Sequence, residues 1–507
     1  MEVRVRMYRQ GLGDCFLLRF GAGEEARHVL IDCGTLGSTT TGVKMKQVAE
    51  DIRDTTGGRL DLLIATHEHK DHLSGFRDQK AIFDPFDVAH VWLAWTEDAA
   101  DPLAQELEKH QGDLIEAVRL AAIALASGEA ADPEEREHLA TLGQGIRQIL
   151  GFFGDVDPGD DASGDALLAS SDLAKTVQEA MTWVTRKAPP PRFLQPGEML
   201  EPDWLPGVRV YVLGPPRDRA ALAQLGDHGS PELYHLAAAQ ARDLRAGAPF
   251  FASGQSMAEW WAAAGGEQRQ QLERLLPFDM RHRLDAAAAA ILERFAAYLE
   301  PGQEWRRIDH DWLAGAADLA LQLDGQTNNT SLALAFELLE EDGKPGAVLL
   351  FPADAQVGNW LSWHAEGMQW QVPDGAGGTR TVTAADLLAR TVLYKVGHHA
   401  SHNATVTDKG LELMQHADLV ALIPVDRKVA MNKTPKWHMP ARALYKRLLE
   451  KAQGRVARSD VGWASRDDAD FGDLFDAEQW SEWEQRQEAA RVDVATLHVE
   501  WRRGSDE

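Results

Sequence analysis

Cysteine is scarce in this sequence, which has only Cys15 and Cys33 among 507 residues. Two cysteines exclude a disulfide framework and favour a reducing compartment, so we expect a cytoplasmic protein. Thiolate metal ligands are the functional alternative, but the spacing fits no common zinc pattern. We therefore interpret both cysteines as small buried side chains in strands.

Long apolar runs are also missing. No run approaches the roughly 18 residues that a membrane span requires. Residues 1–7 alternate polar and apolar side chains like a strand and contain no continuous apolar segment of the signal-peptide kind. We expect neither a membrane segment nor a signal peptide.

Basic residues are outnumbered, with 52 Lys and Arg against 79 Asp and Glu, for a formal net charge of −27. Proteins that grip long nucleic acids usually carry a basic footprint, because phosphate neutralisation supplies most of the affinity. An extended basic nucleic-acid surface is therefore not expected. Small anionic substrates stay open, since bound metal ions can supply positive charge locally.

Strand-like and helical patterns alternate along the chain. Length alone suggests about three domains. Strand texture occupies 1–96, 191–217 and 326–507, and two helical blocks at 97–190 and 218–325 interrupt it. Expected strands are 3–7, 15–20, 28–34, 60–65, 88–95, 208–213, 331–336, 347–351, 391–396, 419–424 and 492–502.

Several other segments have patterns that are typical of helices or loops. Residues 43–57 and 441–452 are expected to be helical, and 154–164 a loop. The acidic stretch 467–488, with Trp480 and Trp483, is interpreted as a solvated, partly helical surface. Apolar helices around 260–261 and 286–299 serve either as core packing or as a cover over a cleft, and the pattern does not choose between these roles.

The densest chemistry lies in Thr66-His67-Glu68-His69-Lys70-Asp71-His72, in the order His-x-His-x-Asp-His. Imidazole and carboxylate are the ligands that borderline divalent metals prefer. The apolar run 60–65 precedes the motif, so a strand would end in a ligand-bearing loop. This combination predicts a metal site.

Three later stretches supply similar groups. Asp354 follows the apolar run 349–353, His398, His399 and His402 follow the strand 391–396, and Asn328-Asn329 precedes the strand 331–336. A strand-end carboxylate can bridge two metals, because its two oxygens point at different ions. Taken singly, these residues also fit a turn, surface polar groups and a loop.

Together these stretches resemble the metallo-β-lactamase superfamily, and within it the nuclease-like branch of ComEC-type competence proteins. The resemblance covers about half of the chain and leaves out the two helical blocks. Its motif around the metal is highly specific and its histidine pair moderately so. It rests on residues 11–14, 30–34, 66–75, 208–216, 328–332, 350–354, 395–401 and 437–440.

The resemblance implies an α/β fold, a four-layer αββα sandwich with two large helical insertions. It also implies two divalent metal ions, Zn²⁺ by ligand type with Mn²⁺ open. His67 and His69 would bind one ion; Asp71, His72 and His399, favoured over His398, would bind the other. Asp354 would bridge them, and Asp32 would hold the motif loop.

The sequence departs from the family pattern in three places. The usual third histidine of the first metal has no counterpart, and Asn328 or Asn329 occupies that neighbourhood. Ala400 stands where a glycine is expected. His438-Met439-Pro440 replaces a His-Pro pair, so His438 is a candidate site residue together with Lys395 and Ser401, as positioning or substrate-binding groups.

The chemistry that follows is hydrolysis. Two ions can share a water and lower its pKa, giving a metal-bridging hydroxide nucleophile, with Asp71 in the catalytic set. His398 or His402 would donate a proton to the leaving oxygen or bind a phosphate. We therefore predict a phosphodiesterase or nuclease acting on an anionic substrate. The alternatives are an acyl-bond hydrolase, for example of thioesters or lactones, and a scaffold whose helical blocks bind a protein partner.

Overall fold

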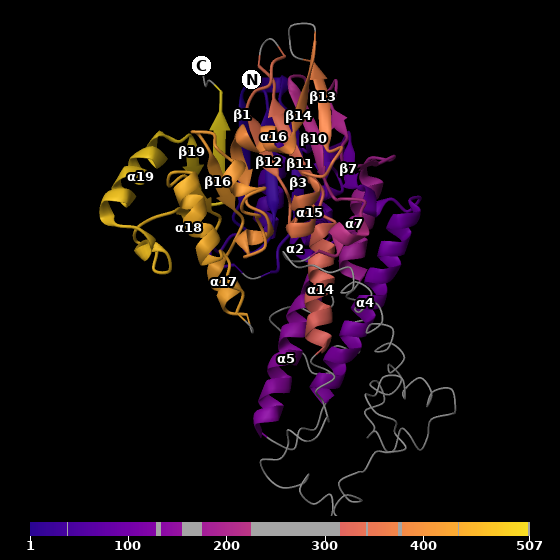
Figure 1. The fold of residues 1–507 in the computed structure, drawn as a ribbon. Coiled ribbons are helices and arrows are strands. Elements are labelled where there is room, and N and C mark those ends of the chain that lie inside the picture. Colours follow the sequence, from indigo (N-terminus) through magenta and orange to yellow (C-terminus); the bar gives the residue numbers. More distant parts are fainter. Residues whose placement is uncertain are drawn as a thin grey trace, which may run out of the picture.

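Two eight-stranded sheets form the centre of the protein (Figure 1). The computed structural model describes residues 1–37, 39–127, 133–154, 175–224, 315–340, 343–373, 378–433 and 436–504. The expected helices at 260–261 and 286–299 lie outside these ranges, as does all of the expected loop 154–164 except its first residue.

The first sheet has the order β19-β20-β1-β2-β3-β5-β7-β8. Its β19 to β3 half is antiparallel, and its β3 to β8 half is parallel. The strands are β1 (Val3–Tyr8), β2 (Cys15–Phe20), β3 (Arg27–Cys33), β5 (Leu62–Ile64), β7 (Val91–Ala94), β8 (Arg192–Leu194), β19 (Val492–Val494) and β20 (His498–Arg503).

The second sheet has the order β18-β17-β16-β15-β12-β11-β10-β9. Its strands from β12 to β17 run parallel, and the others pair antiparallel. They are β9 (Met199–Leu200), β10 (Val208–Gly214), β11 (Ala333–Leu338), β12 (Val348–Phe351), β15 (Thr391–Lys395), β16 (Val420–Ile423), β17 (Val456–Arg458) and β18 (Gly462–Trp463). Two small ribbons pair β4 (Arg59–Leu60) with β6 (Asp87–Val88) and β13 (Gln369–Pro373) with β14 (Thr379–Thr383).

The two sheets pack face to face. Alternate residues of each strand point to opposite faces, so one strand serves two cores. Leu393 lies in the core between the sheets, whereas its neighbour Tyr394 lies in the core on the outer face. Phe16 of the first sheet meets Phe351 of the second edge to face at 5.7 Å. The inner core therefore joins both sheets into one unit.

Helices cover both outer faces. Those on the first sheet are α1 (Met45–Thr56), α2 (Lys70–Asp78), α3 (Lys80–Phe83) and α7 (Lys175–Lys187). The short helix α8 (Arg219–Leu222) follows β10, and its Leu222 packs with Trp95 and Ala104. Those whose side chains join the core of the second sheet include α15 (Val357–Ser362), α16 (Ala384–Ala389), α17 (Arg427–Met431), α18 (Arg442–Lys451) and α19 (Ala477–Ala489). No helix among the described residues is long and apolar enough to cross a membrane.

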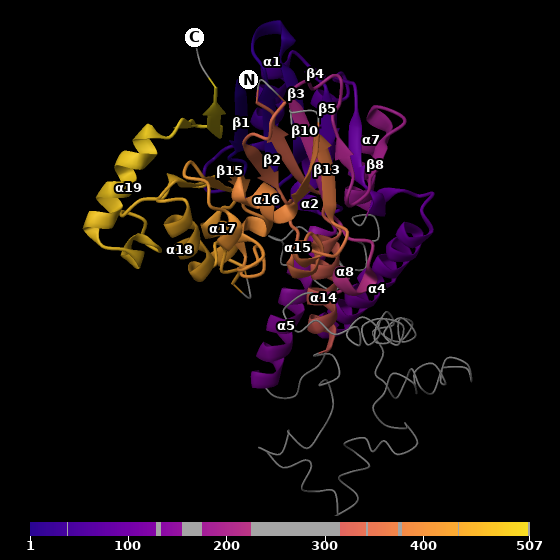
Figure 2. The same ribbon diagram turned by 45° about the horizontal axis from the view of Figure 1, so that its top comes forward.

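The described parts of the two helical blocks lie together. Helices α4 (Pro102–Ser127) and α5 (Pro133–Phe152) of the first block pack with α14 (Gly315–Asn329) of the second (Figure 2). Leu114, Ile146 and Leu323 contribute one side chain each to their shared core. In both views these helices extend from one side of the sheets, away from α19.

Most expected strands are present, but four expectations were wrong. Residues 60–65 form β4 and β5 in different sheets rather than one strand, and residues 88–95 are divided in the same way between β6 and β7. Residues 492–502 form the hairpin of β19 and β20. Trp480 and Trp483 are not solvated, because they are 1% and 4% exposed and pack on each other and on Phe475.

Candidate metal centre

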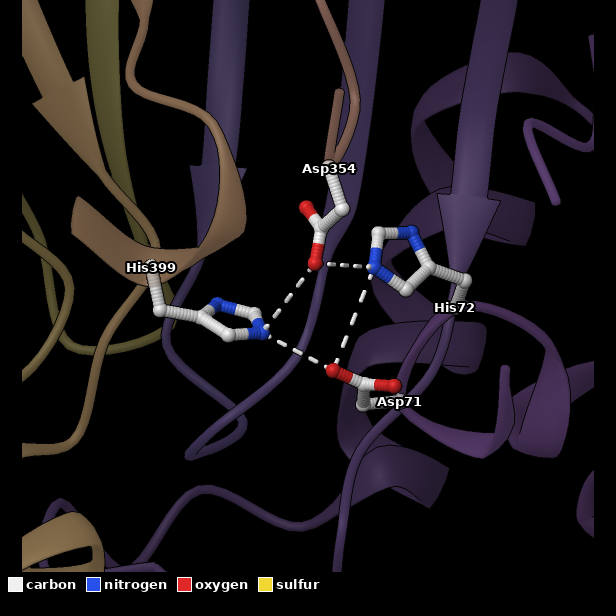
Figure 3. Close-up of side chains that lie close together, drawn as sticks. All are labelled: Asp71, His72, Asp354 and His399. Carbon is white, nitrogen blue, oxygen red and sulfur yellow. Dashed lines mark hydrogen bonds and ion pairs between the residues drawn. The ribbon is translucent and has the colours of Figure 1, made fainter. Parts of the chain in front are cut away.

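Four buried side chains meet where the parallel strands of the two sheets end (Figure 3). Asp71 and His72 lie in the first turn of α2, Asp354 follows β12, and His399 lies in the 3₁₀ turn η8 (His398–Ala400) after β15. Their donor atoms form a ring in which His399 Nε2 lies 2.8 Å from Asp71 Oδ2, and His72 Nε2 lies 3.3 Å from Asp354 Oδ2. The other two edges of the ring are 3.9 Å each.

This donor set fits a divalent cation. Nitrogen and oxygen ligands at about 2.0–2.2 Å around a tetrahedral zinc lie about 3.3 Å from one another, within the range seen here. His72 Nε2 and Asp71 Oδ1 are buried and have no hydrogen-bond partner. Buried polar atoms are rarely left unpaired, so these two atoms point to a ligand. The residues present therefore suit a metal ion.

The electrostatics of the centre also favour a cation. Although burial lowers the pKa of His72, the carboxylates of Asp354 and Asp14 raise it well above its usual value. Burial likewise opposes the charge of His399, yet Asp354 and Asp71 raise its pKa. The carboxylates thus draw positive charge to this point, as protons or as a metal ion.

Hydrogen bonds on the far side of each ring orient both histidines. His72 Nδ1 donates to Asp32 Oδ2 at 2.7 Å, and His399 Nδ1 donates to the Pro424 carbonyl at 2.7 Å. Both Nε2 atoms are thereby left as lone pairs directed at the cluster. Asp32 also accepts from the backbone and hydroxyl of Thr66, at 2.9 and 2.7 Å, and so ties β3 to the motif loop.

Lys395 forms an ion pair with Asp354 through the carboxylate oxygen that faces away from the histidines. Its ammonium is buried and lies 2.5 Å from Asp14 Oδ2 and 3.1 Å from Asp354 Oδ1. Asp354 Oδ1 also accepts from the backbone N–H of His398 at 3.0 Å. Only Oδ2 faces the histidines, and the bridging of two ions by Asp354 stays a prediction. Lys395 is buried and contacts this carboxylate through Oδ1.

His67 and His69 form a second pair of metal-directed nitrogens. His67 Nε2 and His69 Nδ1 lie 3.1 Å apart, close to the separation expected at a shared ion. Burial lowers the pKa of His67 well below its usual value and that of His69 to about 4, so both rings are neutral at pH 7. No third His, Cys, Asp or Glu donor completes a close group with them in the described chain.

Asn328 and Asn329 are the last residues of helix α14 and precede strand β11. The side-chain amide of Asn329 is already used within the fold, because it donates hydrogen bonds to the carbonyls of Leu222 and Gln224. One turn earlier, Asp324 accepts from Asn328 Nδ2 at 3.2 Å, and its Oδ1 is buried without a partner. Burial, Asp71 and Asp354 raise the pKa of Asp324 to about 8.

The first helical block also reaches the centre. Phe152 and Phe153 at the end of α5 pack on the His69 ring, with centroids 5.4 and 4.9 Å away. Trp437 stacks on the other side of Phe152 at 5.1 Å. Sequence reasoning missed these two phenylalanines, together with Asp14 and Asp324. For Asp14 a signal existed, because the turn 11–14 belongs to the resemblance.

Of the remaining candidate residues, His398 is buried beside the centre, whereas His402 and His438 are exposed. His398 is buried, and its Nδ1 lies 2.8 Å from Ser401 Oγ, which in turn donates to Asn403. Burial lowers the pKa of His398 to about 4, so this ring is neutral at pH 7 and poorly suited to donate a proton. His402 and His438 are exposed and do not belong to the group of close donor atoms in the described part of the chain.

Backbone strain concentrates at the same place. Asp32, Ala353, His398, His399 and Ala400 have φ between 43° and 62°, the left-handed region that non-glycine residues avoid. Ala400, with φ 62°, sits where the family pattern has glycine, which explains that preference. Strain of this kind gathers where a fixed geometry serves a function. Close packing adds to it, because a Cβ on Gly34 would lie 2.2 Å from the Asp71 backbone.

The comparisons with known proteins agree with this geometry. A family model described as the metallo-beta-lactamase superfamily matches residues 8–245, and this class implies a metal-dependent hydrolase. The matched range contains the whole motif from His67 to His72, whereas Asp354 and His399 follow it in the chain. Comparison with curated proteins and with solved structures each gave no significant match.

Proposed function

We propose that this protein is a metal-dependent hydrolase with its reaction centre at Asp71, His72, Asp354 and His399. The observation that carries the proposal is the ring of four buried donor atoms, with two histidine lone pairs fixed toward one point. The two facing sheets with helices on both sides support the four-layer αββα sandwich, with insertions at 97–190 and 218–325. Within the superfamily, the ComEC-type branch remains our choice on its motifs.

The chain's own residues have distinct roles in this proposal. Asp71, His72, Asp354 and His399 would hold one divalent ion, Zn²⁺ by ligand type with Mn²⁺ open, and His67 with His69 a second. A bound divalent ion lowers the pKa of a water and polarises the bond to be cleaved. Asp32 and Lys395 orient the donors. His398, neutral and beside Asp354, accepts a hydrogen bond from the nucleophilic water or the substrate.

We favour a phosphodiester as the bond that is cleaved. The motif resemblance supports this choice, and positive charge supplied by bound metal would suit a small or single-stranded anionic substrate. An extended basic surface for nucleic acid is not expected. Phe152 and Phe153 place apolar rings beside His69, which equally suits an acyl substrate, so acyl-bond hydrolysis is the competing chemistry.

Metal analysis and substrate turnover test the proposal together. The purified protein should contain bound Zn²⁺ or Mn²⁺ and should hydrolyse bis-p-nitrophenyl phosphate or single-stranded DNA. His399→Ala and Asp354→Ala should abolish turnover, whereas His364→Ala, a half-buried histidine outside the cluster, should retain it. Metal binding with turnover of p-nitrophenyl acetate alone would refute the phosphodiester claim. Folded, metal-free and inert protein would favour a scaffold.

The cellular setting is part of the proposal. Cys15 and Cys33 lie opposite each other in β2 and β3 as buried free thiols, which supports a reducing compartment such as the cytoplasm. Helices α4, α5 and α14 extend beyond the sheets and offer a surface for a protein partner. Binding of such a partner would be measured with the full chain.

A further inference from the structure

A second polar cavity lies at the end of the sheets opposite the metal centre. Its volume is about 360 Å³, and it is bounded by the start of β16 and β17, the end of α19 and the end of β20. Strand β16 runs from Val420 at this cavity to Ile423, after which the Pro424 carbonyl accepts from His399. The cavity and the metal centre therefore sit at opposite ends of the same strand.

Arginine dominates the lining of this cavity. Five arginines line it, one before β17 and four within residues 486–503, and Asp418 is the one acidic residue in the lining. The arginines are Arg455, Arg486, Arg491, Arg502 and Arg503. Such a concentration is unexpected in a chain whose net charge is −27.

Two of these arginines are neutralised within the protein. Arg486 pairs with Glu482, and Arg502 pairs with Asp493 at 2.8 Å and with Glu500 at 2.7 Å. Their charges are thereby largely compensated. These two arginines line the cavity but add little net positive charge to it.

The other three arginines have no carboxylate within ion-pair distance among the described residues. Arg455 is buried and donates to the carbonyls of Leu419 and Ala417. Arg491 donates to the Gly504 carbonyl. The side chain of Arg503 makes no hydrogen bond or ion pair with the described residues. Backbone carbonyls orient a guanidinium but leave its charge in place.

Three arginines without an ion-pair partner around one cavity offer an excess of positive charge to an anion. Like charges in a concave site repel more strongly than on an open surface, and a bound anion would offset this repulsion. Burial lowers the pKa of Arg455, and the nearby carboxylate of Asp418 partly opposes that shift. A guanidinium presents parallel N–H donors that match phosphate oxygens, and backbone bonds to Arg455 prepare its orientation.

We propose that this arginine cavity, defined by Arg455, Arg491 and Arg503, binds a small anion that carries phosphate groups. Val420, Ala490 and Trp501 provide an apolar floor beside the arginines, which suits a phosphate ester better than a free inorganic ion. The site is separate from the metal centre and does not depend on it. Binding there adds a ligand-controlled input to the proposed hydrolase or anchors a second part of a phosphorylated substrate.

Isothermal titration with inorganic pyrophosphate tests the proposal on the full chain, both metal-loaded and in excess EDTA. We expect saturable binding in EDTA with a Kd below 1 mM, on the order of the affinity that two or three charge-assisted contacts supply. The double variant Arg491→Gln/Arg503→Gln should weaken it at least tenfold. Arg53→Gln/Arg466→Gln changes the net charge equally on exposed positions elsewhere and should alter it less than twofold.

Each possible result of these titrations either supports or overturns the proposal. No binding in EDTA, or equal binding by the two double variants, would overturn the proposal. Malonate, a dicarboxylate of similar size, should bind at least tenfold more weakly, and equal affinity would overturn the assignment to phosphate. Because neither Arg491 nor Arg503 pairs with a carboxylate in the described chain, the double variant Arg491→Gln/Arg503→Gln should melt no lower than the unmodified chain, and the melting curve verifies this.

Discussion

Replacing Asp32 by Asn probes how the chain orients its metal ligands. Asp32 is fully buried and accepts three hydrogen bonds of 2.7 to 2.9 Å, from His72 Nδ1 and from the backbone and hydroxyl of Thr66. Asn has the same size and tolerates the φ of 55° at this position. The variant therefore keeps the fold but replaces a charged acceptor with a neutral amide behind His72.

The expected loss concerns metal affinity. Removing a carboxylate behind a ligating histidine typically costs 10–100-fold in metal affinity, or about 1.4–2.7 kcal/mol. Competition with a chromophoric chelator measures this for Zn²⁺, alongside the stoichiometry of bound metal. Asp61→Asn is the matched control, because Asp61 is also buried and accepts from the His28 backbone at 2.9 Å, far from the cluster. Equal Zn²⁺ affinity in the two folded variants would refute the reasoning.

Three further perturbations follow from the same geometry. Because neighbouring carboxylates raise the pKa values of His72 and His399, protons compete with the metal for these rings. Zn²⁺ affinity should therefore rise with pH and binding should release protons, measured by titration calorimetry in buffers of different ionisation enthalpy. Lys395→Met leaves Asp14 and Asp354 without their buried cation and should lower the free energy of unfolding, measured in urea, by about 3–5 kcal/mol. An unchanged free energy of unfolding would contradict the pairing. Phe152→Ala removes a buried ring from His69 and should lower stability by about 3–5 kcal/mol without changing the metal bound by Asp71 and His399, which metal analysis checks.

The central strands were predictable because their apolar runs are short and bounded by polar turns. The strand at 60–65 was misjudged because Asp61 looks like one polar interruption in an apolar run. In the fold this carboxylate is buried and accepts from the His28 backbone, which separates β4 from β5. Trp480 and Trp483 were misplaced because an acidic stretch gives no sign that Phe475, just before α19, packs on both tryptophans.

The candidate centre was predictable where ligands follow strands directly. His72, Asp354 and His399 each come within a few residues of a strand end, and parallel strand ends meet at one edge. Asp324 and Phe152 could not be found in this way. They lie on helices of the two inserted blocks, and only tertiary packing of α5 and α14 brings them beside the motif.

The construction of the centre argues against a purely structural scaffold. Four carboxylates, from Asp14, Asp32, Asp71 and Asp354, are buried together, and Lys395 is the one lysine or arginine that pairs with any of them in the described chain. Replacing buried charges with apolar side chains of similar volume often leaves stability unchanged or raises it. The strained backbone around His399 and Ala400 costs further free energy of about 1–3 kcal/mol per residue. A scaffold gains nothing from these costs, whereas a cation-binding reaction centre requires the negative charge and the fixed geometry.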